Sequence, residues 1–211
     1  MDTLIVYLNT TKVGVLEQDD SGLLQFSYDQ AWLEKPGAIP LSRSLPLQRD
    51  IFIGKKARPF FAGILPEEEP RKQIARILGI SNSNDFAMLA RIGGECAGAV
   101  SLLPEGVSPS AQASDRHREL SEEELRQIVA ELPQRPLMAG TDGVRLSLAG
   151  VQDKLPVVFQ AGRFSLPLDG TPSTHILKPE PDRFPGLSVN ELFCMSLARA
   201  SGFNVPDTEY F

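Results

Sequence analysis

Short apolar runs separated by turns, followed by one helical pattern, fill residues 144–202 and constrain the fold more than any other feature of the chain. The runs have the length of strands and the turns contain glycine, which is typical of strands joined by tight connections. The pattern predicts an antiparallel sheet plus a helix. The expected strands cover residues 144–148, 154–159, 163–166 and 173–178, with turns at 160–162 and 169–170.

The helix is expected to start at Ser188 and to end near Gly202, where glycine commonly terminates a helix. Its inward face is expected to carry four small or apolar residues, namely Leu192, Met195, Leu197 and Ala198. Residues 208–211 are expected to begin one more strand.

The first half of the chain has its own pattern of strands and helices. Three runs, at residues 4–8, 12–16 and 23–28, predict an antiparallel meander. One helix is expected from Pro70 to Gly79, a second from Asn84 to Gly93, and a returning strand at 98–103. The proline-containing stretch 36–66, with the basic cluster 55–58, is expected to form a surface loop, and contact with a partner protein there is a minority alternative.

Small and polar residues at 105–116 have the composition of a linker. After it, Ser121 and Glu124 have the spacing of a capping box, with Leu120 and Leu125 as the hydrophobic staple, so the acidic run marks a helix start. We therefore expect an α+β protein with three parts: a β-rich amino-terminal subdomain with helices (1–104), a linker and connecting helix (105–140) and a second sheet with a helix (141–211).

The chain has 21 basic and 27 acidic residues, a formal net charge of −6. Proteins that bind nucleic acid by themselves usually carry a basic face, because neutralising phosphates supplies most of that affinity. We therefore expect any DNA contact to be indirect, through a partner.

Several further classes of protein are not indicated. The amino terminus carries an acid where a signal peptide has basic residues, and no run approaches the roughly 20 apolar residues of a membrane span. Cys96 and Cys194 lie far apart, and His117 and His175 are isolated, so neither a disulfide framework nor a metal site is predicted. The expected location is the cytoplasm, without membrane contact.

The turn between residues 145 and 154 is the first candidate for chemistry. Its single glycine, Gly150, allows close approach to a phosphate, and exposed backbone amides around it can form an anion-binding nest. A plain hairpin explains the same pattern. Lys178 ends the apolar run 173–178, where a phosphate-pairing amine would have to lie, although alone it could be a solvated surface lysine.

Glu191 has two competing interpretations. It lies three residues after Ser188, so it can complete a capping box together with a staple from Leu187 to Leu192, and the sequence favours this role. Alternatively it is the helix carboxylate that pairs with Lys178 and orients it, as in protein kinases. The order of strands, a strand ending in lysine, then a helix with an inward glutamate is that of a kinase amino-terminal lobe.

On these residues the chain resembles the HipA-type serine/threonine kinases, toxins of bacterial persistence toxin–antitoxin modules. The resemblance rests on VGVL at 13–16, PLSRSLPLQ at 40–48, IGGECAGAVSLLP at 92–104, RLSLAGVQDK at 145–154, THILK at 174–178, Asn190 and Glu191, and GFNVPD at 202–207. It covers nearly the whole chain.

The resemblance implies roles for particular residues. The loop formed by Ala149, Gly150, Val151, Gln152, Asp153 and Lys154 would cover the phosphates of ATP. Lys178 would contact them with support from Glu191, and Ser147 could be autophosphorylated, which would expel the loop and switch the kinase off. The family's catalytic and magnesium-binding aspartates belong to a carboxy-terminal lobe and are expected beyond Phe211, so this chain alone is expected to be inactive.

The resemblance also implies partners. They are Mg-ATP, a protein substrate such as glutamyl-tRNA synthetase, and a helix-turn-helix antitoxin that carries the DNA contacts. Two alternatives stay open: a non-enzymatic truncated module that binds the antitoxin through residues 1–104, and an unrelated β-rich binding protein in which Gly150 and Lys178 are ordinary hairpin residues.

Overall fold

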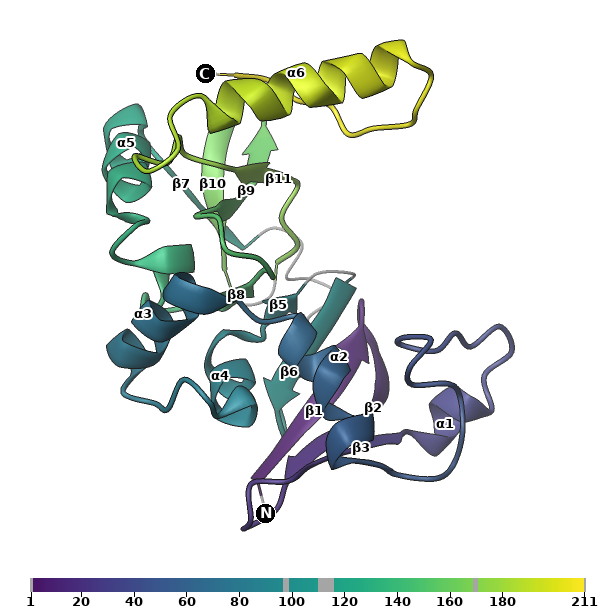
Figure 1. Cartoon of the computed structure of the whole chain (residues 1–211). Coiled ribbons are helices and arrows are strands. Elements are labelled where there is room, and N and C mark those ends of the chain that lie inside the picture. The colour runs from purple at the N-terminus through teal and green to yellow at the C-terminus, as the bar shows by residue number, and fades with distance from the viewer. Residues whose placement is uncertain (1, 97–98, 110–115, 169–170, 211) are drawn as a thin grey trace.

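The computed structural model describes residues 2–96, 99–109, 116–168 and 171–210. Within them two sheets lie one above the other, with the amino terminus at the far end of the first and the carboxyl terminus beside the last helix (Figure 1). The fold is α+β, as the sequence predicts. Buried apolar side chains form one continuous core that reaches from Leu4 in the first sheet to Leu166 in the second.

The first sheet contains seven strands among the described residues, in the order β4-β3-β2-β1-β6-β5-β8. Their bounds are β1 Asp2–Leu8, β2 Thr11–Gln18, β3 Leu24–Tyr28, β4 Phe52–Ile53, β5 Glu95–Cys96, β6 Val100–Pro104 and β8 Leu146–Ser147. The predicted meander is confirmed by the antiparallel pairs β1/β2 and β2/β3, whereas β5 and β8 pair in parallel.

Gly14 in β2 shows why one strand position requires glycine. A Cβ atom there would lie 2.4 Å from the carbonyl oxygen of Ser27 and 2.6 Å from the Phe26 ring. The buried Phe26 ring can therefore pack directly over the β2 backbone.

Residues 2–104 are called the first unit below. Its helices are α1 Gln30–Leu33, α2 Arg58–Gly63, α3 Glu68–Leu78 and α4 Asp85–Ile92, with a 3-10 turn at Gly54–Lys56. The two predicted helices are confirmed as α3 and α4. α3 ends at Gly79 in the left-handed conformation, and Asn84 caps α4 by accepting a 2.9 Å hydrogen bond from the amide of Ala87.

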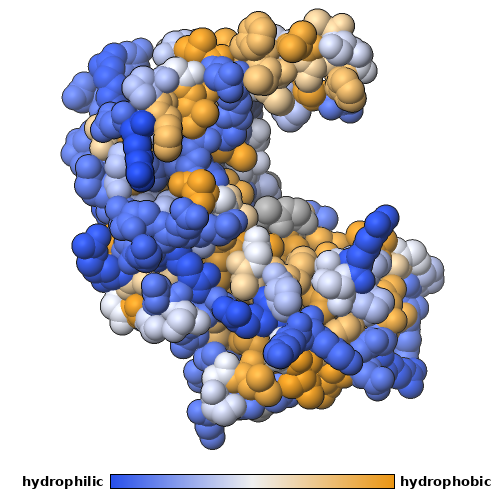
Figure 2. Space-filling view, in the orientation of Figure 1, coloured by the Kyte–Doolittle hydropathy of each residue, from blue (hydrophilic) through white to orange (hydrophobic). Residues whose placement is uncertain are grey.

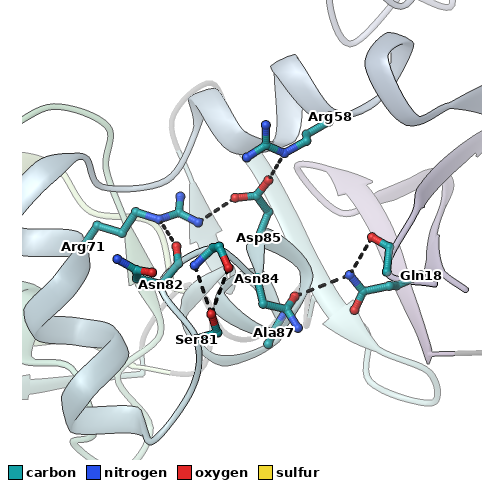
Figure 3. Close-up of polar contacts among 10 residues, drawn as sticks. Gln18, Arg58, Arg71, Ser81, Asn82, Asn84, Asp85 and Ala87 are labelled. Carbon is teal, nitrogen blue, oxygen red and sulfur yellow. Dashed lines mark hydrogen bonds and ion pairs between the residues drawn. The ribbon is translucent and has the colours of Figure 1, made fainter. Parts of the chain in front are cut away.

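A buried carboxylate holds three of these helices together. Asp85, at the start of α4, accepts hydrogen bonds from Arg58 of α2 at 2.7 Å and from Arg71 of α3 at 2.6 Å (Figure 3). Arg71 also donates to the carbonyl of Asn82 in the α3–α4 connection. The charge of Asp85 is thus satisfied from both sides, as a buried ion requires.

The second sheet has four antiparallel strands in the described residues, ordered β11-β9-β10-β7. They are β7 His117–Glu119, β9 Leu155–Gln160, β10 Arg163–Pro167 and β11 His175–Leu177, with the helices α5 Glu122–Glu131 and α6 Leu187–Ala200 and a 3-10 turn at Pro136–Met138. The predicted capping box of α5 is confirmed, because Ser121 and Glu124 hydrogen-bond each other's backbone amides.

Several expectations for this half need correction. The segment 105–140 contributes β7 to the second sheet, and β8, expected beside β9, lies in the first sheet. No strand forms at 208–210, and Leu197 is exposed on α6, whereas Leu192, Met195 and Ala198 are half-buried. The turn predicted at 169–170 and part of the predicted linker, 110–115, lie outside the described residues. None of the described helices has the length and apolar character needed to cross a membrane.

Candidate functional site

The candidate phosphate loop, residues 148–154, connects the two sheets. β8, before it, pairs with β5 of the first sheet, while β9, after it, pairs with β10 and β11 of the second. The plain hairpin is therefore wrong, because the two flanking strands do not pair with each other. The loop lies where a movement of either sheet would change its shape.

Gly150 and Lys154 close this loop on itself. Gly150 has φ 103°, and a Cβ atom at this position would lie 2.9 Å from the Lys154 Nζ. The Lys154 ammonium donates a 2.6 Å hydrogen bond to the Ala149 carbonyl. A side chain at position 150 would thus be strained and would also displace the lysine.

The loop rests on the first unit through its backbone. Pro66 and Gly150 form a parallel bridge, and the Glu67 amide donates to the Gly150 carbonyl at 3.5 Å. Both residues belong to the connection between α2 and α3. Nothing local in the sequence predicts a contact of Pro66 and Glu67 with Gly150, because more than 80 positions separate them.

Ser147 is fully buried at the edge of the first sheet, and its hydroxyl donates a 2.8 Å hydrogen bond to the Ile64 carbonyl. Its neighbour across the parallel pair is Cys96, where burial raises the pKa of the thiol to about 12. In this conformation the Ser147 hydroxyl has a partner and no solvent access. A reaction at this hydroxyl requires β8 and the loop to leave the first sheet.

Arg145 fixes the start of β8. Its guanidinium donates to the carbonyls of Ala90 at 2.9 Å and Leu102 at 3.3 Å. Ala90 lies in the last turn of α4, where carbonyls have no partner within the helix. Burial lowers the pKa of Arg145, but a guanidinium stays charged. The entry to the loop is therefore anchored in the first unit.

Lys178 lies beside Lys154 at one end of the second sheet. β11 pairs with β9 so that Leu177 is opposite Leu155, and continuing this antiparallel register by one residue places Lys178 next to Lys154. Burial, followed by the positive charge of Lys178, lowers the pKa of Lys154. Lys154 lies against Gly150, and the charge of Lys178 acts on Lys154, as do the opposite charges of Glu67 and Asp153. Two lysines near one turn are the kind of group that attracts an anion.

Glu191 of α6 makes an ion pair with Lys178. The predicted capping box between Ser188 and Glu191 is wrong, since the N-cap residue of α6 is Gly186, which has no side chain to complete such a box. The Ser188 amide, which Glu191 would bond in such a box, instead donates to the carboxylate of Glu180 at 2.9 Å. Glu191 is thereby left to hold the lysine.

The remaining loop residues differ in their surroundings. Val151 is exposed, and burial raises the pKa of Asp153. The buried Nε2 of Gln152 has no hydrogen-bond partner among the described residues. A cavity of about 10 Å³ lies between the loop, Pro66 before α3 and Leu137 in the 3-10 turn after α5. This is about the volume of one water. A phosphate would therefore have to bind on the solvent side of the loop.

Metal ligands are not gathered here. Within the described residues no group of three or more histidine, cysteine, aspartate or glutamate side chains could hold a metal ion. The donor set fits the phosphates of a nucleotide but not a magnesium ion.

An apolar surface borders the site. Val189, Phe193 and Leu197 of α6 are exposed, as are Phe184 before it and Phe203 after it. Figure 2 shows apolar surface at the top of the molecule, where Figure 1 places α6, and a hollow between this part and the lower part of the molecule.

The fold and the site define an α+β protein. In its second sheet, as in a kinase amino-terminal lobe, a strand is followed by a lysine, Lys178, and then by a helix that carries a glutamate, Glu191. Comparison with known proteins gives the family: the model of the HipA N-terminal domain matches residues 4–103, and that of the HipA-like C-terminal domain matches residues 146–211. The chain belongs to the HipA family.

Individual relatives agree with this assignment. A putative kinase, Y4mE of Sinorhizobium fredii, is 46% identical over 200 residues, 93% of this chain and 48% of the relative. The serine/threonine-protein kinase toxin HipA of Shewanella oneidensis is 30% identical over 209 residues, 98% of this chain and 46% of the relative. The chain thus spans about half the length of the curated relatives it matches.

A solved structure is similar as well. It is that of the Shewanella oneidensis toxin–antitoxin system HipA, HipB and its operator DNA complex, with a TM-score of 0.75 and 29% identity. The match covers 98% of this chain and 47% of that one.

Proposed function

We propose that the complete protein to which these residues belong is an ATP-dependent serine/threonine kinase toxin of a toxin–antitoxin system. The observation that carries the proposal is the convergence of Lys154, Lys178 and the Gly150 turn, with Glu191 paired to Lys178. Relatives that are named kinases support it.

In this proposal residues 149–154 cover the phosphates of ATP, with Gly150 permitting close approach. Lys178 contacts the phosphates and Glu191 orients the lysine, because a charge-paired amine is held in one place rather than sampling many rotamers. ATP supplies the transferred phosphoryl group. Magnesium ligands and the catalytic aspartate are proposed to lie beyond Phe211, so residues 1–211 alone are proposed to be inactive, and no step through the metal is assigned to them.

The exposed apolar residues of α6 are proposed to pack against the rest of the complete protein. The matched relatives are about twice as long as this chain, and in the proposal it is polypeptide of the kind they have beyond the match that covers these residues. The proposed location is the cytoplasm.

The proposed partner is a helix-turn-helix antitoxin. The similar Shewanella structure is a complex of HipA with HipB and operator DNA. With a net charge of −6, this chain is proposed to meet DNA only through the antitoxin. The proposed substrate is a translation factor such as glutamyl-tRNA synthetase, and Ser147 is the proposed autophosphorylation site.

A titration of ATP into the complete protein tests the proposal. Lys178→Ala is expected to weaken ATP binding at least about tenfold, as loss of a charged contact costs more than about 1.4 kcal/mol. Lys72→Ala, which removes an exposed lysine on α3, serves as the matched control and should bind as the unchanged protein does. Equal affinities for all three proteins would contradict the proposal.

The same preparation distinguishes the non-enzymatic alternative. A protein without measurable ATP affinity that copurifies with a basic helix-turn-helix protein would be a binding module acting through residues 1–104. The acidic net charge is compatible with both functions, so the ATP titration is the deciding measurement.

A further inference from the structure

Glu180 lies in the connection between β11 and α6, between Pro179 and Pro181. Its carboxylate accepts hydrogen bonds from three successive backbone amides at the start of α6: that of Gly186, that of Leu187 at 3.1 Å and that of Ser188 at 2.9 Å. These are amides that have no partner within a helix. A single side chain, six to eight residues earlier in the chain, therefore caps α6.

The cap resolves a competition for Glu191. A Ser188–Glu191 capping box would turn the Glu191 carboxylate back toward the helix start. With Glu180 on the amides, Glu191 can extend to Lys178 and form the ion pair that the structure shows. Glu180 therefore caps α6 and Glu191 pairs with Lys178, whereas the sequence pattern offers Glu191 for both roles.

The connection is closed at both ends. Lys178 is bonded to α6 through Glu191, and Glu180, two residues further on, is bonded to the first turn of the same helix. The flanking prolines restrict the backbone on either side of Glu180, because each proline fixes its own φ. The end of β11 and the start of α6 are therefore held in one relative position.

Charge supports the same arrangement. The Ser188 hydroxyl and the amides of residues 186–188 lower the pKa of Glu180, so that it is ionised at neutral pH. A carboxylate at a helix start also interacts favourably with the helix dipole.

We infer that Glu180 is a positioning residue for nucleotide binding, acting through the Lys178–Glu191 pair that it holds in register. The inference rests on the proposed function, since it concerns the same lysine. Removing Glu180 should let the first turn of α6 fray, which moves Glu191 and releases Lys178.

The experiment uses ATP titrations of the complete protein with five variants. Glu180→Ala is expected to weaken ATP binding about three- to tenfold, the range that corresponds to losing a helix cap. Glu180→Gln, whose amide oxygen still accepts hydrogen bonds, should lose less. Glu209→Ala, at an exposed glutamate near the carboxyl terminus, is the control and should bind normally.

The decisive comparison is non-additivity. If Glu180 acts through Glu191, the double variant Glu180→Ala with Glu191→Gln should bind ATP no more weakly than Glu191→Gln alone. A residue that only stabilises the fold would instead add its own loss. Additive losses, or unchanged affinity in Glu180→Ala, would overturn the inference.

Hydrogen exchange provides a readout that does not depend on ATP. The amides of residues 186–188 should exchange faster in Glu180→Ala and Glu180→Gln, while amides of the buried β9 should not. Unchanged exchange at the helix start would overturn the inference even if a variant lost ATP binding. Failure of the proposed function gives a different result: ATP binding that is absent, or indifferent to Lys178→Ala, with faster exchange still observed.

Discussion

The Ser147 hydroxyl donates a 2.8 Å hydrogen bond to the main-chain carbonyl of Ile64, 83 positions earlier in the chain. This bond joins the last strand of the first sheet to the end of α2, directly before the Gly150 loop. Because Ser147 is fully buried, the loop is held on the first unit by a group that would have to be exposed before it could be modified.

A negative charge at Ser147 should therefore release the loop. Ser147→Asp places a carboxylate among apolar side chains beside a carbonyl oxygen, and burying an unpaired charge costs at least about 2 kcal/mol. We expect faster proteolysis and faster hydrogen exchange at residues 148–154.

Two variants control this prediction. Ser147→Ala removes only the hydrogen bond, so it should cost about 1 kcal/mol of stability and leave the loop protected. Ser108→Asp adds the same charge at an exposed serine and should change neither quantity. A loop that stays protected in Ser147→Asp would show that β8 tolerates the charge.

Glu95 predicts a pH dependence of stability. It lies in β5 and accepts hydrogen bonds from the amide and hydroxyl of Ser173, before β11, at 2.8 and 2.6 Å. Burial raises the pKa of Glu95 despite these bonds. In the pH range just above the ordinary glutamate pKa of 4.5, the folded protein therefore binds more protons than the unfolded chain at this site.

The contribution of Glu95 to stability should thus fall as the pH rises from about 4 through its raised pKa, and then stay constant. Glu95→Gln should remove this decline, measured as the free energy of unfolding in urea at a series of pH values. Glu124→Gln is a matched comparison with the opposite sign, because the amide and side chain of Ser121 and the nearby Arg118 lower the pKa of Glu124. A pH profile unchanged by Glu95→Gln would contradict the assignment.

Local signals in the sequence were sufficient where a structure depends on neighbouring residues. The Ser121–Glu124 box, the left-handed Gly79 and the β1–β3 meander follow from caps, glycines and alternation over a few positions. The second role considered for Glu191, its pairing with Lys178, was also identified from the order of elements.

Long-range pairing could not be predicted in this way. β8 has two residues and β7 three, so their sheets are decided by partners far away in the sequence rather than by their own propensity. Two further features could not be predicted from local signals. One is the cap from Glu180, and the other is the set of contacts that Ile64, Pro66 and Glu67 make with β8 and the loop. The paired prolines around Glu180 were a visible signal, but a rigid connection does not itself identify what its carboxylate bonds.

Gly14 offers a test of close packing in the first sheet. Gly14→Ala would push a methyl group against the Ser27 carbonyl and the Phe26 ring, and the backbone oxygen cannot move without breaking the β2/β3 pair. We expect a loss of about 2–3 kcal/mol in the free energy of unfolding. Gly63→Ala, at a helical position with open space around it, should be neutral or slightly stabilising. Equal effects at the two positions would contradict this packing.

The buried Asp85 should be a major source of stability in the first unit. Its loss should affect its two arginine partners differently, because only one of them is buried. Asp85 is 3% exposed and the Arg71 side chain 16%, whereas the Arg58 side chain is 61% exposed and can turn to solvent. Asp85→Asn keeps the shape of the side chain but leaves the buried guanidinium of Arg71 without a counter-charge. We expect a loss of about 2–3 kcal/mol in urea unfolding, below the roughly 3–5 kcal/mol of a fully buried pair, since Arg58 remains hydrated.

Arg58→Ala should cost less than 1 kcal/mol and Arg71→Ala about as much as Asp85→Asn, because only Arg71 also bonds the Asn82 carbonyl between α3 and α4. The prediction is that Asp85 stabilises the protein mainly by joining α3 to α4 through Arg71. A larger loss of stability in Arg58→Ala than in Arg71→Ala would contradict it.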